Sequence, residues 1–132
     1  MNEIFGAKPY FGGESKIEEI TNDIKQVLQS GKLSLGSYTN NFESEMANIT
    51  QSEYAVSVSS GGSSLELTLQ SLELNGGHVI VPTDTFVATA NAVIRAGGVP
   101  IFADINKETL CLDLEDLQSR ISSQTVGVIF VH

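Results

Sequence analysis

The stretch that decides the fold runs from Val56 to Leu72 and reads VSVSSGGSSLELTLQSL. A short apolar run from Tyr54 to Val58 predicts a buried strand near residues 54–59. Six small residues, 59–64, form a turn, and leucines at helical spacing begin directly after it. A strand, a small-residue turn and a helix in that order present backbone N–H groups at the positive end of the helix, where a phosphate binds well.

The residues of the turn suit an anion. Gly61 and Gly62 let the backbone approach a ligand closely because they have no Cβ, and Ser63 and Ser64 can cap the helix or donate hydroxyls. The alternative is a plain strand-to-helix turn with a serine cap. This stretch alone leaves both interpretations open, because the N-terminus of any helix presents N–H groups that can bind an anion.

Composition narrows the class of protein. The 132 residues are enough for one ordinary domain, and a net charge of −9 opposes sequence-independent binding to nucleic acid or to an anionic membrane. No apolar run approaches the roughly 20 residues that cross a bilayer, and the N-terminus lacks signal-peptide features, so we expect a cytoplasmic protein. The lone Cys111 excludes a disulfide framework and a Cys-based metal cluster, and we expect it to be a buried apolar residue; no metal site is predicted.

Apolar runs and helical patterns alternate along the rest of the chain. Helices are expected near 15–30, 40–49, 63–73, 86–96 and 113–121, and strands near 54–59, 78–82, 99–104 and 125–131. The first helix is expected to start with a capping box of Ser15 and Glu18 and to end at Gly31, and the second to bury Phe42, Met46 and Ile49. All four strands are continuous apolar runs, which predicts an α/β fold, a mainly parallel sheet with helices on both faces.

We expect residues 1–132 to form a single incomplete domain. Residues 1–50 would be an N-terminal helical arm, irregular up to residue 13, and residues 51–132 the first part of the α/β domain. His132 stands at the end of the last predicted strand, where ligands bind in parallel sheets, and no helix follows it. The chain is therefore expected to be a fragment of a longer protein.

Five segments in this order resemble the first third of the DegT/DnrJ/StrS-type sugar aminotransferases: GKLSLG (31–36), NNFESEMA (40–47), AVSVSSGGSSLELTLQSL (55–72), HVIVPTDTFVATANAVIRAGGVPIFADI (78–105) and VGVIFVH (126–132). The resemblance covers nearly the whole chain. It implies the N-terminal part of the large domain of a type I pyridoxal-phosphate (PLP) enzyme. Such an enzyme transfers an amino group, usually from glutamate, to a keto sugar attached to a nucleotide, and is a homodimer when full length.

The resemblance also implies site residues. The family's Ser-Gly-Thr turn, which holds the PLP phosphate, falls on Ser60, Gly61 and Gly62, with Ser63 next; Gly62 in place of threonine removes a hydroxyl contact. The family's aromatic that stacks on the pyridine ring falls on Phe86, for which core packing is the alternative.

Three further parts of the chain carry expectations. Gly31, Lys32, Leu33 and Ser34 match a loop near the bound sugar substrate in the family. His78 stands where the family has an acidic residue and is expected to be a turn residue. Asp104 is expected to be structural, capping the next turn.

PLP chemistry needs a lysine and an acid for the pyridine nitrogen, and in the family both lie beyond residue 132. None of the five lysines present matches the family's motif, so no catalytic residue is assigned and the fragment alone is expected to be inactive. Three alternatives stay open. One is a sugar dehydrase of the same family, with histidine replacing the lysine. The others are a phosphate-binding α/β module without catalysis and a non-functional truncated product.

Overall fold

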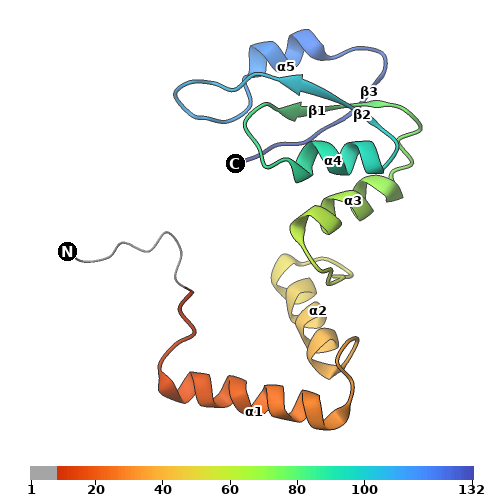
Figure 1. The fold of residues 1–132 in the computed structure, drawn as a ribbon. Helices are drawn as coiled ribbons and strands as arrows, with labels where there is room; N and C mark the ends of the chain where they lie inside the picture. Colours follow the sequence, from red (N-terminus) through yellow and green to blue (C-terminus); the bar gives the residue numbers. More distant parts are fainter. Residues whose placement is uncertain (1–8) are drawn as a thin grey trace, which may run out of the picture. The chain divides into compact units, whose positions relative to one another are not determined.

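The computed structural model describes residues 9–132. The chain divides into two compact units, Met1–Ser57 and Val58–His132, and each is described by itself. In Figure 1 the first is coloured red to yellow and the second green to blue.

The first unit contains α1 (Glu14–Ser30) and α2 (Ser37–Thr50). The predicted capping box is wrong, because Gly13 is the N-cap of α1 and no side chain caps the helix there, which leaves Ser15 inside the first turn. The predicted end is confirmed. Gly31 adopts a left-handed φ of 68° and its N–H donates to the carbonyl of Leu28, a conformation that glycine adopts without strain.

The apolar side chains of these two helices are largely exposed in this unit. Phe42 and Ile49 on α2 were expected to be buried but are exposed, Ile49 by 74%, and Met46 is half-buried. No residue of α1 or α2 is fully buried. An amphipathic pattern predicts which side of a helix is apolar, but burial needs a second element to cover that side.

The second unit is a small parallel sheet with helices. Its elements are α3 (Gly61–Ser71), β1 (His78–Pro82), α4 (Ala88–Arg95), β2 (Val99–Ala103), α5 (Leu114–Arg120) and β3 (Thr125–Val128). The strand order is β2-β1-β3, and both pairs are parallel. The predicted mainly parallel α/β fold is confirmed.

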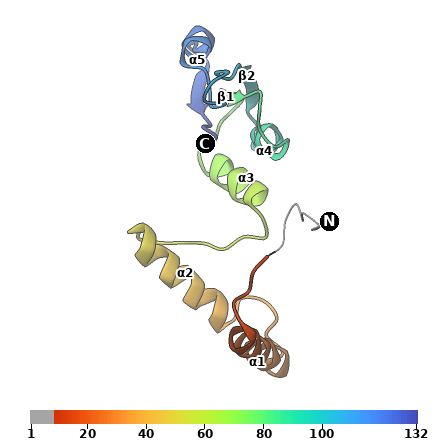
Figure 2. The ribbon, with the colours of Figure 1, turned by 90° about the vertical axis from the view of Figure 1, so that its left-hand side faces the viewer.

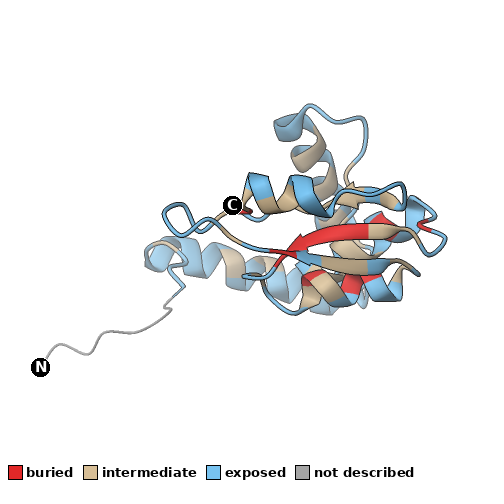
Figure 3. Ribbon diagram, turned by 90° about the horizontal axis from the view of Figure 1, so that it is seen from above, coloured by how far each residue is buried: buried red, intermediate tan, exposed pale blue. Residues whose placement is uncertain are grey.

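The central strand shows why the apolar runs are continuous. Val79 and Val81 pack on one side of the sheet against residues of α3 and α4, and Ile80 packs on the other side against Ala103 and Leu112. Buried residues accordingly gather on the central strand and on the neighbouring helix in Figure 3. In Figures 1 and 2, α4 and α5 lie on opposite faces of the sheet, so helices cover both faces as predicted.

One predicted strand is absent from the described part of the chain. Residues 54–58 are without regular secondary structure, and no strand pairs with them. Tyr54 and Val56 are 77% and 79% exposed, although the apolar run predicted burial. A strand exists only with a hydrogen-bonded neighbour, and local sequence does not supply one. The last strand is also shorter than predicted, ending at Val128.

Candidate functional site

The glycine-serine turn opens α3 two residues earlier than predicted. The helix begins at Gly61, and its N-cap is Ser60, whose Oγ accepts from the N–H of Ser63 at 3.1 Å. The expectation that Ser63 or Ser64 caps the helix is therefore wrong. Both glycines belong to the first turn of the helix because Ser60, the residue before Gly61, has the extended backbone and the side-chain oxygen that an N-cap needs.

The N–H groups at this end are free of backbone partners, as predicted. The N–H of Ser64 makes the first helical bond, to the carbonyl of Ser60 at 3.0 Å, and no backbone carbonyl accepts from Gly61, Gly62 or Ser63. The hydroxyl of Ser63 lies 3.2 Å from that of Ser59 and 3.0 Å from that of Ser60. A Cβ built on Gly61 would meet no atom within 4 Å, so the space beside this residue is open.

Gly62 brings this helix end close to α4. A Cβ built on Gly62 would lie 3.3 Å from the Cβ of Ala88, the first residue of α4. Further along, the Arg95 Nε donates to the Glu66 Oε2 at 2.7 Å, which ties α3 to the last turn of α4. The two helices are therefore held together at two separate points.

Phe86 lies in the loop that enters α4, two residues before Ala88. The hydroxyls of Thr85 and Thr89 are 2.8 Å apart, and the Thr89 N–H donates to the Phe86 carbonyl at 2.9 Å. These bonds fix the loop while the Phe86 side chain stays 79% exposed. Core packing, the alternative for Phe86, is therefore not observed.

These features place free N–H groups, hydroxyls and an exposed aromatic ring around the contact between α3 and α4. N–H groups at a helix start hold an anion without a lysine, and an exposed ring offers a face for stacking. Such an arrangement suits a ligand that combines a phosphate with a flat ring.

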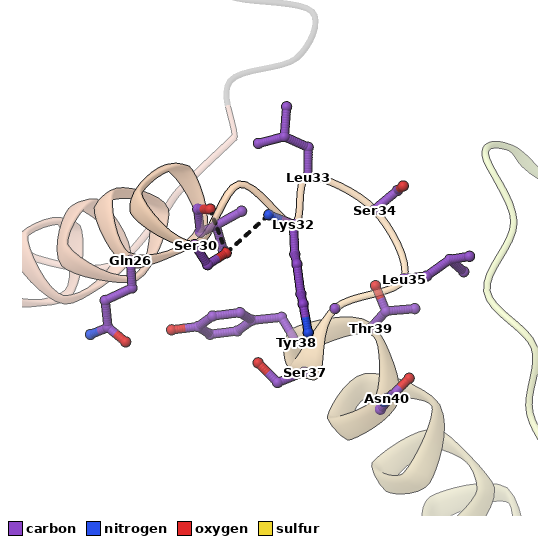
Figure 4. Close-up of a pocket in the computed structure, with 12 residues that line it drawn as sticks. Gln26, Ser30, Lys32, Leu33, Ser34, Leu35, Ser37, Tyr38, Thr39 and Asn40 are labelled. Carbon is purple, nitrogen blue, oxygen red and sulfur yellow. Dashed lines mark hydrogen bonds between the residues drawn. The ribbon is translucent and has the colours of Figure 1, made fainter.

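The loop between α1 and α2 borders a hollow of about 740 Å³ in the first unit. Lys32, Leu33 and Ser34 line it, whereas Gly31 is not among the lining residues. In Figure 4 the Lys32 side chain extends toward Ser37 and Tyr38, while Leu33 points the opposite way. A hydrogen bond to Asp23 raises the pKa of the Tyr38 phenol.

The structure also bears on the expectations for three single residues. His78 is the first residue of β1 rather than a turn residue, and its N–H donates to the Gln124 carbonyl. Asp104 is structural as expected, since its Oδ1 accepts from the N–H of Ile105 at 2.8 Å. Cys111 is only half-buried, not buried as expected.

Sequence reasoning missed several residues that shape these regions. Ser60 was detectable as a candidate cap, because serine is a preferred N-cap residue. No local pattern marks the pairs Thr85–Thr89 and Glu66–Arg95, because their hydrogen bonds form only in the folded chain.

Within the described residues, no helix is long and apolar enough to span a membrane.

Comparison with known proteins finds a sugar-phosphate aminotransferase and a sugar-nucleotide dehydratase among the similar proteins. The chain is 37% identical over 118 residues to the 3-oxo-glucose-6-phosphate:glutamate aminotransferase of Bacillus subtilis (strain 168), which covers 89% of this chain and 27% of that relative. The crystal structure of NtdA from Bacillus subtilis with bound cofactor PMP matches with a TM-score of 0.80 at 32% identity, over 99% of this chain and 32% of the other.

A third match is the crystal structure of a GDP-4-keto-6-deoxymannose-3-dehydratase with a trapped PLP-glutamate geminal diamine. Its TM-score is 0.74 at 29% identity, over 83% of this chain and 30% of the other. The chain thus spans about a third or less of the length of each of these proteins. The family model of the DegT/DnrJ/EryC1/StrS aminotransferases matches residues 14–132, and the chain therefore belongs to this family.

Proposed function

We propose that the whole protein is a PLP-dependent aminotransferase that moves an amino group from glutamate to a keto sugar linked to a nucleotide. The observation that carries this proposal is the juxtaposition at the α3–α4 contact. The N–H groups of Gly61 and Gly62 have no backbone partner, and Gly62 packs close to Ala88, two residues from the exposed Phe86.

The residues of this chain fit the cofactor in character. The N–H groups of Gly61 and Gly62 and the hydroxyl of Ser63 would hold the phosphate, and Phe86 would cover one face of the pyridine ring. When bound, the cofactor supplies an electron sink for amino-group transfer. The hydroxyl that Gly62 lacks relative to the family is available from the three neighbouring serines, Ser59, Ser60 and Ser63.

Residues of the first unit would contact the substrate. We propose that Gly31, Lys32, Leu33 and Ser34 contact the sugar substrate, with Lys32 placed to meet its phosphate groups. The hollow they border supports this assignment for all but Gly31, which would shape the loop through its left-handed turn.

The relatives support the reaction class. One relative is named an aminotransferase that uses glutamate and an oxo-sugar phosphate. The dehydratase, named for a GDP-linked keto sugar, was crystallised with a trapped adduct of PLP and glutamate. We further propose a cytoplasmic homodimer for the whole protein. In it, residues 1–132 would form one incomplete domain, divided into a helical arm (1–50) and the first part of the PLP-binding domain (51–132).

Two variants of this function are each favoured by one relative. The Bacillus subtilis relative favours a keto sugar phosphate instead of a nucleotide sugar as the amino acceptor. The dehydratase structure favours loss of a hydroxyl group instead of gain of an amine. Both variants use the same phosphate seat and the same aromatic ring.

The decisive experiment incubates the whole enzyme with PLP, glutamate and a panel of acceptors. The panel holds GDP- and UDP-linked keto sugars and 3-oxo-glucose 6-phosphate, and the readouts are 2-oxoglutarate release and product mass. We expect 2-oxoglutarate and an aminated nucleotide sugar. A deoxygenated product without an amine would replace the aminotransferase with the dehydratase, and failure to bind PLP would favour a phosphate-binding module without catalysis.

A further inference from the structure

The segment just before the glycine-serine turn has no strand partner but is tied to α2 by one side chain. The Glu43 Oε1 accepts from the Ser57 N–H at 2.7 Å and from the Ser57 hydroxyl at 2.8 Å. Glu43 lies in the middle of α2, 14 residues earlier in the chain. A carboxylate therefore supplies the hydrogen bond that a neighbouring strand would otherwise give to this backbone N–H.

The two hydrogen bonds from Ser57 to Glu43 are charge-assisted. A charged acceptor makes shorter hydrogen bonds than a neutral one, and both donors here converge on a single oxygen. The two bonds from Ser57, the backbone one first, lower the pKa of Glu43. Glu53 and Tyr54 are the titratable side chains that share a hollow with Glu43, and they come from the segment that faces α2.

The tie is close to the candidate phosphate seat along the chain. Ser57 precedes the helix cap Ser60 by three residues, a span of at most about 10 Å of extended backbone. The hydroxyl of Ser59, between them, already contacts that of Ser63. A restraint at Ser57 therefore limits the freedom of the chain as it enters the turn.

We infer that Glu43 is a positioning residue: its carboxylate fixes the backbone at Ser57 and so holds the entry to the anion-binding turn at Ser59–Ser63. The link to Ser57 follows from the geometry alone, whereas its effect on PLP rests on the proposed function. Above the ordinary Glu pKa of 4.5 the carboxylate is charged and the tie is complete. As the pH falls through the lowered pKa of the folded state, the carboxylate becomes protonated and the tie weakens.

The test compares Glu43→Ala, Glu43→Gln and the control Glu45→Ala, an exposed glutamate on the same helix. In the whole protein, hydrogen–deuterium exchange of the peptide that contains Ser57 should accelerate about tenfold in Glu43→Ala, the scale of one bond to a charged acceptor. Glu43→Gln keeps a neutral acceptor and should lie between wild type and Glu43→Ala. Glu45→Ala should exchange like wild type.

Acidification separates the charge from the shape of the side chain. After correction for intrinsic exchange, wild type should lose protection at Ser57 as the pH falls below the ordinary Glu pKa of 4.5 and through the lowered pKa of the folded state. Glu43→Gln should show no such step. Equal exchange in wild type and Glu43→Ala, or an acid step that persists in Glu43→Gln, would overturn the tie.

Titrations with PLP and with inorganic phosphate at neutral pH complete the test. Glu43→Ala should bind both about tenfold more weakly, in line with the loss of one charge-assisted bond, and Glu45→Ala should bind them like wild type. Faster exchange at Ser57 with unchanged affinities would overturn the positioning role. If wild type binds phosphate but not PLP, the proposed function fails, while the phosphate arm still decides the inference about Glu43. If Glu43→Ala fails to fold, Glu43→Gln and Ser57→Ala, which removes only the hydroxyl donor, carry the same comparison.

Discussion

At the scale of single residues, Phe86 is the sharpest test of the candidate site. Its ring is 79% exposed, so truncation removes little from the core of this unit. In the whole enzyme, Phe86→Ala should weaken PLP binding by about 1–3 kcal/mol, from lost stacking and lost burial of the ring. Fluorescence titration with PLP measures this, and thermal unfolding should change little.

The control is Phe102→Ala, which truncates an aromatic on β2 that is 47% exposed and is not assigned to the site. It should leave PLP affinity unchanged. A Phe86→Ala variant that binds PLP normally but unfolds at a much lower temperature would show that Phe86 is a packing residue in the whole protein.

Gly62 is the second residue whose identity has a stated physical reason. A Cβ at this position would lie 3.3 Å from the Cβ of Ala88, closer than ordinary contact distance, so Ala88 would have to shift. We expect Gly62→Ala to weaken PLP binding by about 1–3 kcal/mol, the usual cost of an added methyl group in a packed contact. Added in the Gly62→Ala background, Ala88→Gly should restore most of that affinity, as measured by the same titration. A double variant no better than Gly62→Ala would show that the contact with Ala88 does not set the affinity.

At the scale of elements, α5 depends on its cap. The Oδ1 of Asp113 accepts from the N–H groups of Glu115 and Asp116, both at 2.9 Å. Asp113→Ala should lower the free energy of unfolding by about 0.5–2 kcal/mol because these N–H groups lose their partner. Urea unfolding measures the change, and Asp84→Ala, an exposed aspartate without a capping role, should leave stability near that of wild type.

A second aspartate in α5 makes this element sensitive to acid. Asp116 accepts from Arg120 at 2.6 Å and from the Asp104 N–H at 2.7 Å, and these bonds, Arg120 first, lower its pKa below the ordinary 3.8. Its contribution to stability is therefore complete above pH 3.8 and is lost as the pH falls through the lowered pKa of the folded state. Wild type should melt at a higher temperature than Asp116→Asn at neutral pH. The difference in melting temperature should disappear when the pH falls below the lowered pKa of Asp116. Asp84→Asn should not differ from wild type at either pH, and a gap that persists in strong acid would contradict the assignment.

The elements also show what local sequence can and cannot predict. The strands at 78–82, 99–103 and 125–128 were predictable because each is a short continuous apolar run between helical patterns, and the central one, β1, is buried between the two core clusters. The run at 54–58 looks the same locally, yet it finds a carboxylate instead of a strand partner. Pairing is a property of distant neighbours, and the residue pattern does not contain it.

The candidate site divides in the same way. N–H groups without backbone partners at Gly61–Ser63 follow from a small-residue turn before a helix, and they were predicted. The resemblance pointed to Phe86, and the structure shows that it is exposed. The contacts that hold the turn and the aromatic loop, Gly62 with Ala88 and Glu43 with Ser57, join residues 14 or more positions apart. Such contacts were not predicted because single-sequence patterns are local.

At the scale of the whole molecule, the lysines decide what this chain can do by itself. Lys16, Lys25, Lys32 and Lys107 are all exposed, and Lys8 lies outside the described residues. A desolvated pocket, which would activate an amine as a nucleophile, surrounds none of these four side chains. At Lys16 the hydrogen bond and the charge of Glu19, 2.8 Å away, raise the pKa.

We therefore expect the 132-residue chain, purified alone and incubated with PLP at neutral pH, to form no stoichiometric borohydride-reducible adduct. Absorbance spectra and peptide mass mapping after reduction should show only slow, scattered labelling, because no lysine of the described residues lies in a pocket that would activate its amine. Lysozyme or another protein with exposed lysines, matched for lysine concentration, gives the background rate. A single lysine labelled to one equivalent would contradict the expectation and would mean that this chain already contains a reactive amine. Replacing Lys32 by arginine would then be the first step, because Lys32 borders the hollow assigned to the substrate and arginine keeps the charge without a reactive amine.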